Sequence, residues 1–569
     1  MKKRQIIILA TMALGIFLCM LDTTVMNIAL PAIQTGLHTD LNTLQWALNV
    51  YTITFAALTI PLGRIADQIG RHKVYVLGLI LFFTGSLLSA ASSTVIILIS
   101  GRELQSIGAA IIFPASMTIG INSVELSKRN EAVVVLGITQ GLATALGPTI
   151  GGLLTQVWGW RGIFYINIPL VLIAIVLCLL LLPMRNEKNV RAKLDITGML
   201  LAIFTLFSLT LALVQGSEWG WSSSKILCLF VGFVVSLGLF IWRETSASDP
   251  MIRLDLFRYR HFTGAIIVTV FAGIFFVGMM VLMPSFFTKI QSHTELEAAL
   301  MITPASAMVF LFSPVSGLLL KKAGSRLLIS LGIILLAFGY VGISIMDPDI
   351  YWQFAISCIF IGAGYGIIIG PITVLSAGNF TGELLTASQS VTGVFRQIGT
   401  VLAVAIFVSA LSTNLEIAKV QVWSTAQTEI KKISVNQNER KQILQTTHKS
   451  LYDTGSSTTK NNPSINSQAQ KKIVMAETNC YLIKHNGTQW PTAAKKKVQA
   501  KISVTVKEKI RKINQQVDNY RQTISKTAKK KMTIAFIKPY QVAMPFAWML
   551  LLTVFIFEKG NKNLRKLRN

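Results

Sequence analysis

Charged residues inside long apolar runs are the clearest sites for chemistry in this 569-residue chain. The four deepest are Asp22, Arg102, Glu103 and Arg396. An unpaired charge at the centre of a bilayer costs at least ~2.5 kcal/mol, so each of them needs a partner, water or a function. A carboxylate there can load and unload a proton, because the loss of water favours its neutral form and a nearby cation favours its charged form.

Asp22 is predicted to carry a proton. A helical rise of ~1.5 Å per residue puts it ~14 Å below Pro31, and it puts Arg102 ~12 Å below Thr94, at the start of its own helix. The two charges therefore fit one depth in the membrane and would interact. The alternative for Asp22 is a hydrogen bond that only joins two helices. Arg102 does not release its proton, so it would tune a carboxylate or fix helix packing.

The two remaining charges have less certain partners in the sequence. Glu103 follows Arg102 and lies ~100° around the same helix. We interpret it as a second proton or substrate site, or as one member of a buried pair. Arg396 has few acidic residues near it in the sequence, so packing against the carbonyl groups of another helix is the favoured role.

A short polar loop between two apolar runs is predicted to act as a gate. Gly63, Asp67, Gly70 and Arg71 combine small residues for a tight turn with charges of both signs. An ion pair of Asp67, or its position at a helix N-terminus, would hold two helix ends together in one conformation and release them in another. The alternative is an ordinary solvated loop.

A second gating candidate is a glycine string in the fifth apolar run. Gly147, Pro148, Gly151 and Gly152 leave one helix face almost without side chains and add a bend. Small residues let another helix approach closely, and the bend is where that contact could open. Simple close packing without gating is the alternative.

The elements that carry these residues are long apolar helices. Apolar residues make up 52% of the chain and charged residues 14%, which excludes an ordinary soluble domain. A bilayer core of ~30 Å needs roughly 20 apolar helical residues. The sequence predicts fourteen such windows, at 6–30, 46–66, 74–93, 95–118, 131–154, 163–183, 196–215, 224–242, 262–287, 298–320, 327–345, 352–376, 384–411 and 541–557.

Basic residues indicate the orientation of these windows. If the N-terminus is cytoplasmic, the inner segments hold most of the Lys and Arg, and the short outer loops hold only Arg161, Lys225 and Lys289. Cytoplasmic loops normally carry this excess. We therefore predict a multi-pass protein of the cell membrane with both termini in the cytoplasm.

One long polar segment accounts for much of the formal charge of +28. Residues 413–540 hold 24 Lys and Arg against 7 Asp and Glu, a surplus of 17. Because long loops cross the membrane largely regardless of charge, we place this segment outside. Apolar residues recur at steps of three and four from Val506 to Ile524, which indicates a helical hairpin. A disordered polybasic loop is the alternative. Cell-wall polyanions are a predicted partner, and no nucleic-acid groove is implied.

The chain shows no constellation for hydrolysis or redox chemistry. It has no phosphate-binding loop, no paired cysteine motif and no metal-spaced histidine pair. We predict no cofactor, no metal and no enzymatic activity, which leaves transport driven by an ion or by the gradient of the substrate itself.

Together these motifs resemble the major facilitator superfamily, in particular its fourteen-helix branch of drug:proton antiporters. The stretch from Leu21 to Pro31 resembles the first-helix motif of that branch, and the stretch from Gly63 to Lys73 resembles the loop motif of the superfamily. Arg102 to Ala110 is similar to its fourth-helix proton-relay motif, although Ser106 replaces the expected glycine. The glycine string resembles the antiporter motif that separates exporters from symporters. A weaker copy of the loop motif, in which Lys321 replaces the acid, indicates two related halves.

The resemblance implies an all-α membrane protein with two six-helix bundles and two linking transmembrane helices. It implies proton-coupled export of hydrophobic or amphiphilic, often cationic, compounds, with protons and membrane lipids as further partners. An exporter or flippase of a lipid or cell-envelope precursor is the alternative, and an uptake symporter is disfavoured. The expected parts are a first bundle, two linking helices, five helices of a second bundle, a basic insertion, and a last helix with a basic tail, at 1–184, 185–257, 258–412, 413–540 and 541–569.

Overall fold

The computed structural model describes residues 2–39, 41–125, 128–183, 195–247, 249–252, 254–378, 380–452, 467–485 and 490–557. Every regular element in these ranges is a helix, and fourteen helices are long and apolar enough to cross a membrane. The predicted all-helical fold class is confirmed. Four parts of the sequence predictions lie outside the described residues. They are the side chain of Lys321, the loop at 184–194, the polar centre at 453–466 and the tail at 558–569.

The chain divides into two compact units. The first contains Met1–Ala410 and Ile537–Asn569, and the second contains Leu411–Phe536. Two long helices contribute to both units, α14 (Gly382–Glu429) and α17 (Thr492–Met549). The apolar part of each helix belongs to the first unit and its polar part to the second.

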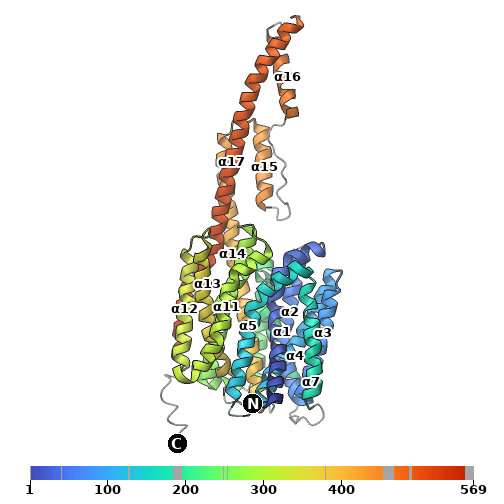
Figure 1. Cartoon of the computed structure of the whole chain (residues 1–569), viewed down its shortest axis with the longest axis vertical. Coiled ribbons are helices and arrows are strands. Elements are labelled where there is room, and N and C mark those ends of the chain that lie inside the picture. The colour runs from blue at the N-terminus through green and yellow to red at the C-terminus, as the bar shows by residue number, and fades with distance from the viewer. Residues whose placement is uncertain are drawn as a thin grey trace. The chain divides into compact units, whose positions relative to one another are not determined.

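The first unit begins with six spans that form the N-terminal bundle (Figure 1). The most extensive packing joins α3 to α4, α1 to α5 and α2 to α4. The last of the six spans combines a one-turn helix, α6, with α7. The bounds are α1 (Lys3–Gly36), α2 (Leu41–Ile69), α3 (Arg71–Ala90), α4 (Val95–Asn122), α5 (Arg129–Trp158), α6 (Gly162–Tyr165) and α7 (Asn167–Leu181).

Two further helices follow, α8 (Ile196–Trp219) and α9 (Ser224–Ser246), and they pack against each other. Only 17% of the most apolar window of α9 is buried, so most of this helix is free to contact lipid. Glu244 near its end accepts backbone N–H groups of Met251 at 3.2 Å and Ile252 at 2.9 Å. These bonds fix the segment that leads to the one-turn helix η2 (Leu254–Arg258).

The second bundle contains α10 (Arg260–Lys289), α11 (Glu295–Ala323), α12 (Ser325–Ile345) and α13 (Tyr351–Ala377), with the apolar parts of α14 and α17. The predicted window 541–557 is not one continuous α-helix. The helix α17 stops at Met549, and a 3-10 helix, η5 (Leu550–Ile556), continues to the end of the span. The bundles meet where α5 packs on α11. The Thr149 and Thr303 hydroxyls are 2.9 Å apart there, and Ser306 donates to the carbonyl of Ala145.

The second unit is built from the polar part of α14, α15 (Gln437–Tyr452), α16 (Ser467–Lys484) and the polar part of α17, with a short 3-10 turn, η3 (Ile430–Lys432). Two small apolar clusters hold it together. In the larger cluster Val422 and Ala426 of α14 pack with Val517 and Tyr520 of α17. In the smaller cluster α16 packs on α17 through Val474, Val506 and Ile510. Several residues of the Val506 to Ile524 repeat therefore lie in buried contacts.

Candidate functional site

An ion pair between α1 and α4 lies inside the N-terminal bundle. Nη1 of Arg102 donates to Oδ2 of Asp22 at 2.5 Å. The side chains are 1% and 4% exposed, so the pair is cut off from bulk water. The structure thus brings together the two charges that the helical rise predicts at one depth.

Three side chains donate to the Asp22 carboxylate. Besides Arg102, Nε2 of Gln105 reaches Oδ1 at 3.3 Å, and Nδ2 of Asn167 at the start of α7 reaches the same oxygen at 3.4 Å. Gln105 also donates to the Ser86 hydroxyl at 2.8 Å and accepts from Arg102 at 3.0 Å. The charged form of Asp22 is therefore stabilised by hydrogen bonds from α4 and α7, as buried charges require.

Sequence reasoning missed Gln105, Asn167 and Ser86 as members of the site. A helical signal for Gln105 exists, because it lies three residues after Arg102 and so shares its face of α4. No periodicity marks Asn167 or Ser86, which come from other helices.

The guanidinium of Arg102 is also enclosed on its other sides. Its central carbon lies 4.3 Å from the ring centroid of Tyr51 and 5.9 Å from that of Phe164. Its Nε donates to the carbonyl of Ala47 at 3.4 Å. A desolvated cation over aromatic faces is attracted by about 2 kcal/mol. Arg102 is thus held in place by α1, α2 and the segment around α6.

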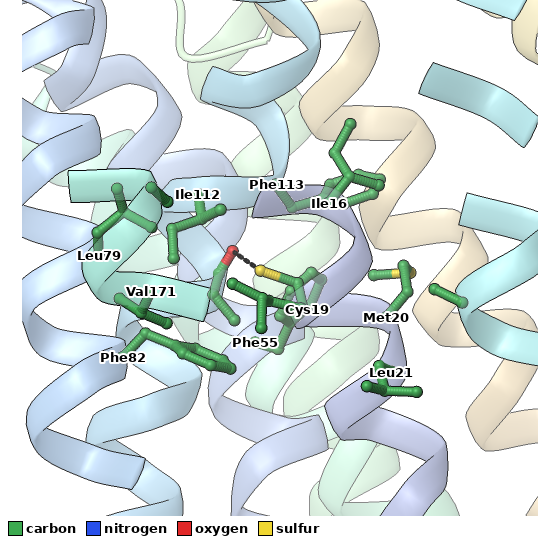
Figure 2. Close-up of a cluster of buried hydrophobic side chains, with 14 of the residues drawn as sticks. Ile16, Cys19, Met20, Leu21, Phe55, Leu79, Phe82, Ile112, Phe113 and Val171 are labelled. Carbon is green, nitrogen blue, oxygen red and sulfur yellow. Dashed lines mark hydrogen bonds between the residues drawn. The ribbon is translucent and has the colours of Figure 1, made fainter. Parts of the chain in front are cut away.

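Apolar side chains surround the turn of α1 that precedes Asp22. Figure 2 shows Cys19 packed near Phe55, with its thiol directed at a main-chain carbonyl that belongs to Ala109 at 3.9 Å. Met20 and Leu21 are also buried. Coulombic interactions are stronger in such a low-dielectric environment than in water. A change in the charge of Asp22 would therefore leave Arg102 poorly compensated unless the helices moved.

Glu103 is not brought to this cluster. Its side chain is exposed, on a different face of α4 from the buried Arg102. Its assignment as a second proton site stays a prediction.

The predicted gating loop is shorter than expected, because Gly63 and Asp67 lie within α2, Gly70 makes the turn and Arg71 begins α3. These residues lie in a polar contact between the two bundles. Nε of Arg71 donates to Oδ1 of Asp67 at 2.5 Å, and the Asp67 side chain is 3% exposed. Asp67 and Thr386 of α14 line the same small cavity. One turn earlier, Nη1 of Arg64 is 2.9 Å from Oε2 of Glu383, also of α14. The sequence predicted an ion pair of Asp67 without naming its partner, and it did not indicate the link from Arg64 to α14.

Two of the loop glycines have a structural reason for their size. Gly70, with φ of +122°, makes the turn between α2 and α3, and L side chains rarely adopt this conformation. A Cβ atom on Gly63 would lie 2.6 Å from the Ser390 hydroxyl of α14. A small cavity at this contact is also lined by Pro250, Met251 and Ile252, so the segment after α9 takes part in it.

The glycine string of α5 contacts two helices at once. A Cβ atom on Gly151 would lie 2.8 Å from the carbonyl oxygen of Val25, and one on Gly147 would overlap Thr24, both of α1. On the other side a Cβ atom on Gly152 would lie 3.1 Å from Ala299 of α11. Pro148 lies inside the helix. The string therefore allows α5 to pack between the helix of Asp22 and the second bundle.

Comparisons with known proteins agree with this arrangement. The family model "Major Facilitator Superfamily" matches residues 12–404. The chain is 31% identical to multidrug resistance protein Stp of Mycobacterium tuberculosis, over 73% of this chain and 77% of that protein. It is 32% identical to the methylenomycin A resistance protein of Bacillus subtilis, over 70% and 86%. It is 29% identical to the probable multidrug resistance protein EmrY of Escherichia coli, over 68% and 76%.

The fold also resembles a solved structure, the human organic anion transporter MFSD10. The TM-score is 0.51 with 13% sequence identity, over 71% of this chain and 94% of that one. The chain belongs to the Major Facilitator Superfamily, a family of membrane transporters and not of enzymes. The predicted family, fold class and multi-pass membrane character are confirmed.

Proposed function

We propose that this member of the Major Facilitator Superfamily is a proton-coupled antiporter that exports hydrophobic and amphiphilic compounds across the cytoplasmic membrane. The observation that carries the proposal is the buried Asp22 to Arg102 pair. The names of its relatives, several of which are multidrug resistance or export proteins, support the direction of transport.

Asp22 is the proton carrier in this mechanism. Arg102 stays charged in proteins, so protonation of Asp22 removes one charge of the pair and leaves a buried cation. That state is costly until α1 and α4 move and Arg102 finds water or another acceptor. Proton loading thereby favours a different arrangement of the helices, which is the requirement for alternating access. Each proton moved through the membrane potential supplies ~2.3 kcal/mol per 100 mV.

The contacts of α1 give a route by which this change reaches the second bundle. Gly147 and Gly151 hold α5 close to α1, and the Thr149 and Thr303 hydroxyls join α5 to α11. A shift of α1 would thus press on a helix that packs against the other bundle. Close-packed helices of this kind switch between discrete arrangements and do not deform continuously.

The polar contact of α2 with α14 is the gate. The Arg64 to Glu383 pair closes one end of the bundle interface, and it must break for that end to open. The distribution of Lys and Arg assigns this end to the cytoplasm, together with both termini.

The decisive experiment uses purified full-length protein in liposomes with an imposed pH gradient and a panel of dyes and lipids. Asp22→Asn should abolish gradient-driven movement and leave dye binding measurable. The matched control is Glu103→Gln, which removes an exposed acid from the adjacent helix and should keep coupled transport. Coupling that survives in Asp22→Asn and fails in Glu103→Gln would move the carrier role to Glu103. Gradient-driven movement of lipid but of no dye would instead favour the lipid exporter.

A second, separable function concerns the basic segment. Basic side chains are exposed along α17, among them Lys507, Lys509, Arg511 and Lys512. We propose that this segment binds polyanions of the cell wall. Polyglycerol phosphate should bind the wild type at low salt and release as salt rises, because surface charges are screened. Replacing these four residues by Gln should weaken binding about tenfold and leave dye transport unchanged. Equal binding by both proteins would refute it.

A further inference from the structure

Arg396 lies at the middle of α14 with respect to the membrane. It is fourteen residues from Gly382, where α14 begins, and fourteen from Ala410, where the first unit ends. At ~1.5 Å per residue each distance is ~21 Å, so the side chain lies near the centre of a bilayer core of ~30 Å. Substrate sites of transporters lie at this depth, at the interface of the two halves.

The face of α14 that carries Arg396 is turned toward protein. Gln389 and Thr392, which precede it by seven and four residues and therefore share its face, are 2% and 3% exposed. Gly393, on an adjacent face, would bring a Cβ atom 2.7 Å from Phe113 of α4. Arg396 therefore points into the interior of the transporter, toward the meeting place of the bundles, and not into lipid.

The Arg396 side chain is half-buried, and one of its donors lacks a partner among the described residues. Its Nε atom is buried, and no hydrogen bond to it is found among the described residues. The favoured sequence-based role, packing against carbonyl groups, is thus not seen in the described part of the chain. Buried donors are normally paired, so an Nε donor at mid-membrane without a partner among the described residues is open to an acceptor that a ligand supplies.

An aromatic pair lies beside it. Tyr365 of α13 lies within electrostatic range of Arg396, and its ring stacks on Phe276 of α10 with centroids 4.2 Å apart and planes 6° from parallel. Phe276 and Tyr365 are buried. A flat apolar surface next to a planar five-donor cation suits a molecule that has both an aromatic part and an acidic oxygen.

Among the described residues, the helices of the second bundle carry no acid at the depth of Arg396. The acids of its helices are at helix ends, namely Glu295 and Glu297 at the start of α11 and Glu383 at the start of α14. Asp22 of the first bundle is engaged by Arg102. The uncompensated charge at mid-membrane is therefore positive.

We infer that Arg396 and the Tyr365 to Phe276 pair form a substrate subsite for amphiphilic organic anions, in place of the cations that the family resemblance implies. The guanidinium binds a carboxylate, sulfonate or phenolate oxygen, and the aromatic pair holds the ring system. This inference rests on the proposed export function and specifies its substrate class.

The test uses two dyes that share a xanthene ring and differ in charge, fluorescein as the anion and rhodamine 6G as the cation. Binding is measured by fluorescence anisotropy on full-length protein in nanodiscs at about pH 8. We expect fluorescein to bind the wild type at least about tenfold more tightly than rhodamine 6G. Arg396→Gln should lose about tenfold for fluorescein only. Arg396→Lys should lie between them, because lysine keeps the charge but not the fork of donors.

Lys289→Gln is the matched control, since it removes an exposed charge at the end of α10 and should leave both affinities unchanged. Size-exclusion profiles establish folding, and Arg396→Lys serves as the test if Arg396→Gln does not fold. Unchanged fluorescein binding in both variants, or tighter wild-type binding of rhodamine 6G, overturns the inference. Gradient-driven transport of rhodamine 6G would in that case leave the proposed function standing. Conversely, Arg396-dependent binding without gradient-driven movement of either dye would overturn the proposed function alone.

Discussion

Arg64 of α2 and Glu383 of α14 form an ion pair with Nη1 and Oε2 2.9 Å apart, although 319 positions separate them in the chain. The pair joins the two bundles at the end where α2 leads into α3. Arg64 is 10% exposed and Glu383 is 33% exposed, so water screens the pair only in part. An interaction of this type fits a gate, because it is strong enough to bias a conformation and weak enough to break in every cycle.

The gate pair predicts a measurable coupling energy. In a double-mutant cycle of Arg64→Gln and Glu383→Gln, thermal unfolding in detergent should give an interaction of about 1 kcal/mol. Each single variant should also increase the rate at which a cysteine placed at Ser390 reacts with a water-soluble thiol reagent. The exposed Cys228 and Cys480 are first replaced by Ser. A cysteine at Ser390 that reacts equally in all variants would argue against gating.

The buried pair predicts non-additive stability. Arg102→Gln removes the cation that pairs with Asp22 and should lower the free energy of unfolding by about 3–5 kcal/mol. The double variant Asp22→Asn with Arg102→Gln removes both charges. Its loss of unfolding free energy should be smaller than the sum of the losses in the two single variants. Glu103→Gln should change stability by no more than about 0.5 kcal/mol. Strictly additive losses would show that the two charges do not interact.

The contact of α5 with α1 predicts opposite effects of one substitution at two glycines. Gly151→Ala would press a methyl group against the Val25 carbonyl, so it should destabilise the protein and slow transport. Gly273→Ala in α10 meets nothing within 4 Å and should be neutral or stabilising by up to about 1 kcal/mol, because alanine is the better helix former. Melting temperature and initial transport rate distinguish the two, and similar losses at both positions would contradict the close approach.

The start of α8 predicts a defined pH dependence. Burial alone would raise the pKa of Asp195, but its hydrogen bonds with Arg243 and with the backbone of Gly198 outweigh burial and lower that pKa below its ordinary value. The stability that Asp195 contributes is therefore present above its unfolded pKa of about 3.9 and is lost only as pH falls through the lower folded value. Asp195→Asn should lower the melting temperature equally at about pH 5 and pH 8. A difference that shrinks at pH 5 would show that the pKa is not lowered.

The sequence determined which segments form membrane-spanning helices and where several charged residues lie along them. The fourteen apolar windows each have the length that a helix needs to cross the bilayer. A spanning segment of this kind forms a helix, because its backbone groups must be paired within the segment. The rise per residue placed Asp22 and Arg102 at one depth, and the charges of both signs between the second and third windows indicated an ion pair of Asp67. These predictions succeed because each depends on one helix, or on one coordinate that all spanning helices share.

Tertiary structure decided everything that depends on how helices are rotated and which of them become neighbours. Only packing shows that Gln105 and Asn167 complete the Asp22 site while Glu103 is exposed. Only packing brings Glu383 and Thr386 to the last turns of α2. The same reason applies to Arg396, for which the sequence favours packing against carbonyl groups, whereas the structure leaves its Nε atom without a hydrogen bond among the described residues. Periodicity along one chain carries no information about which turn of another helix will meet it, because that choice is made by the fit of side chains between helices.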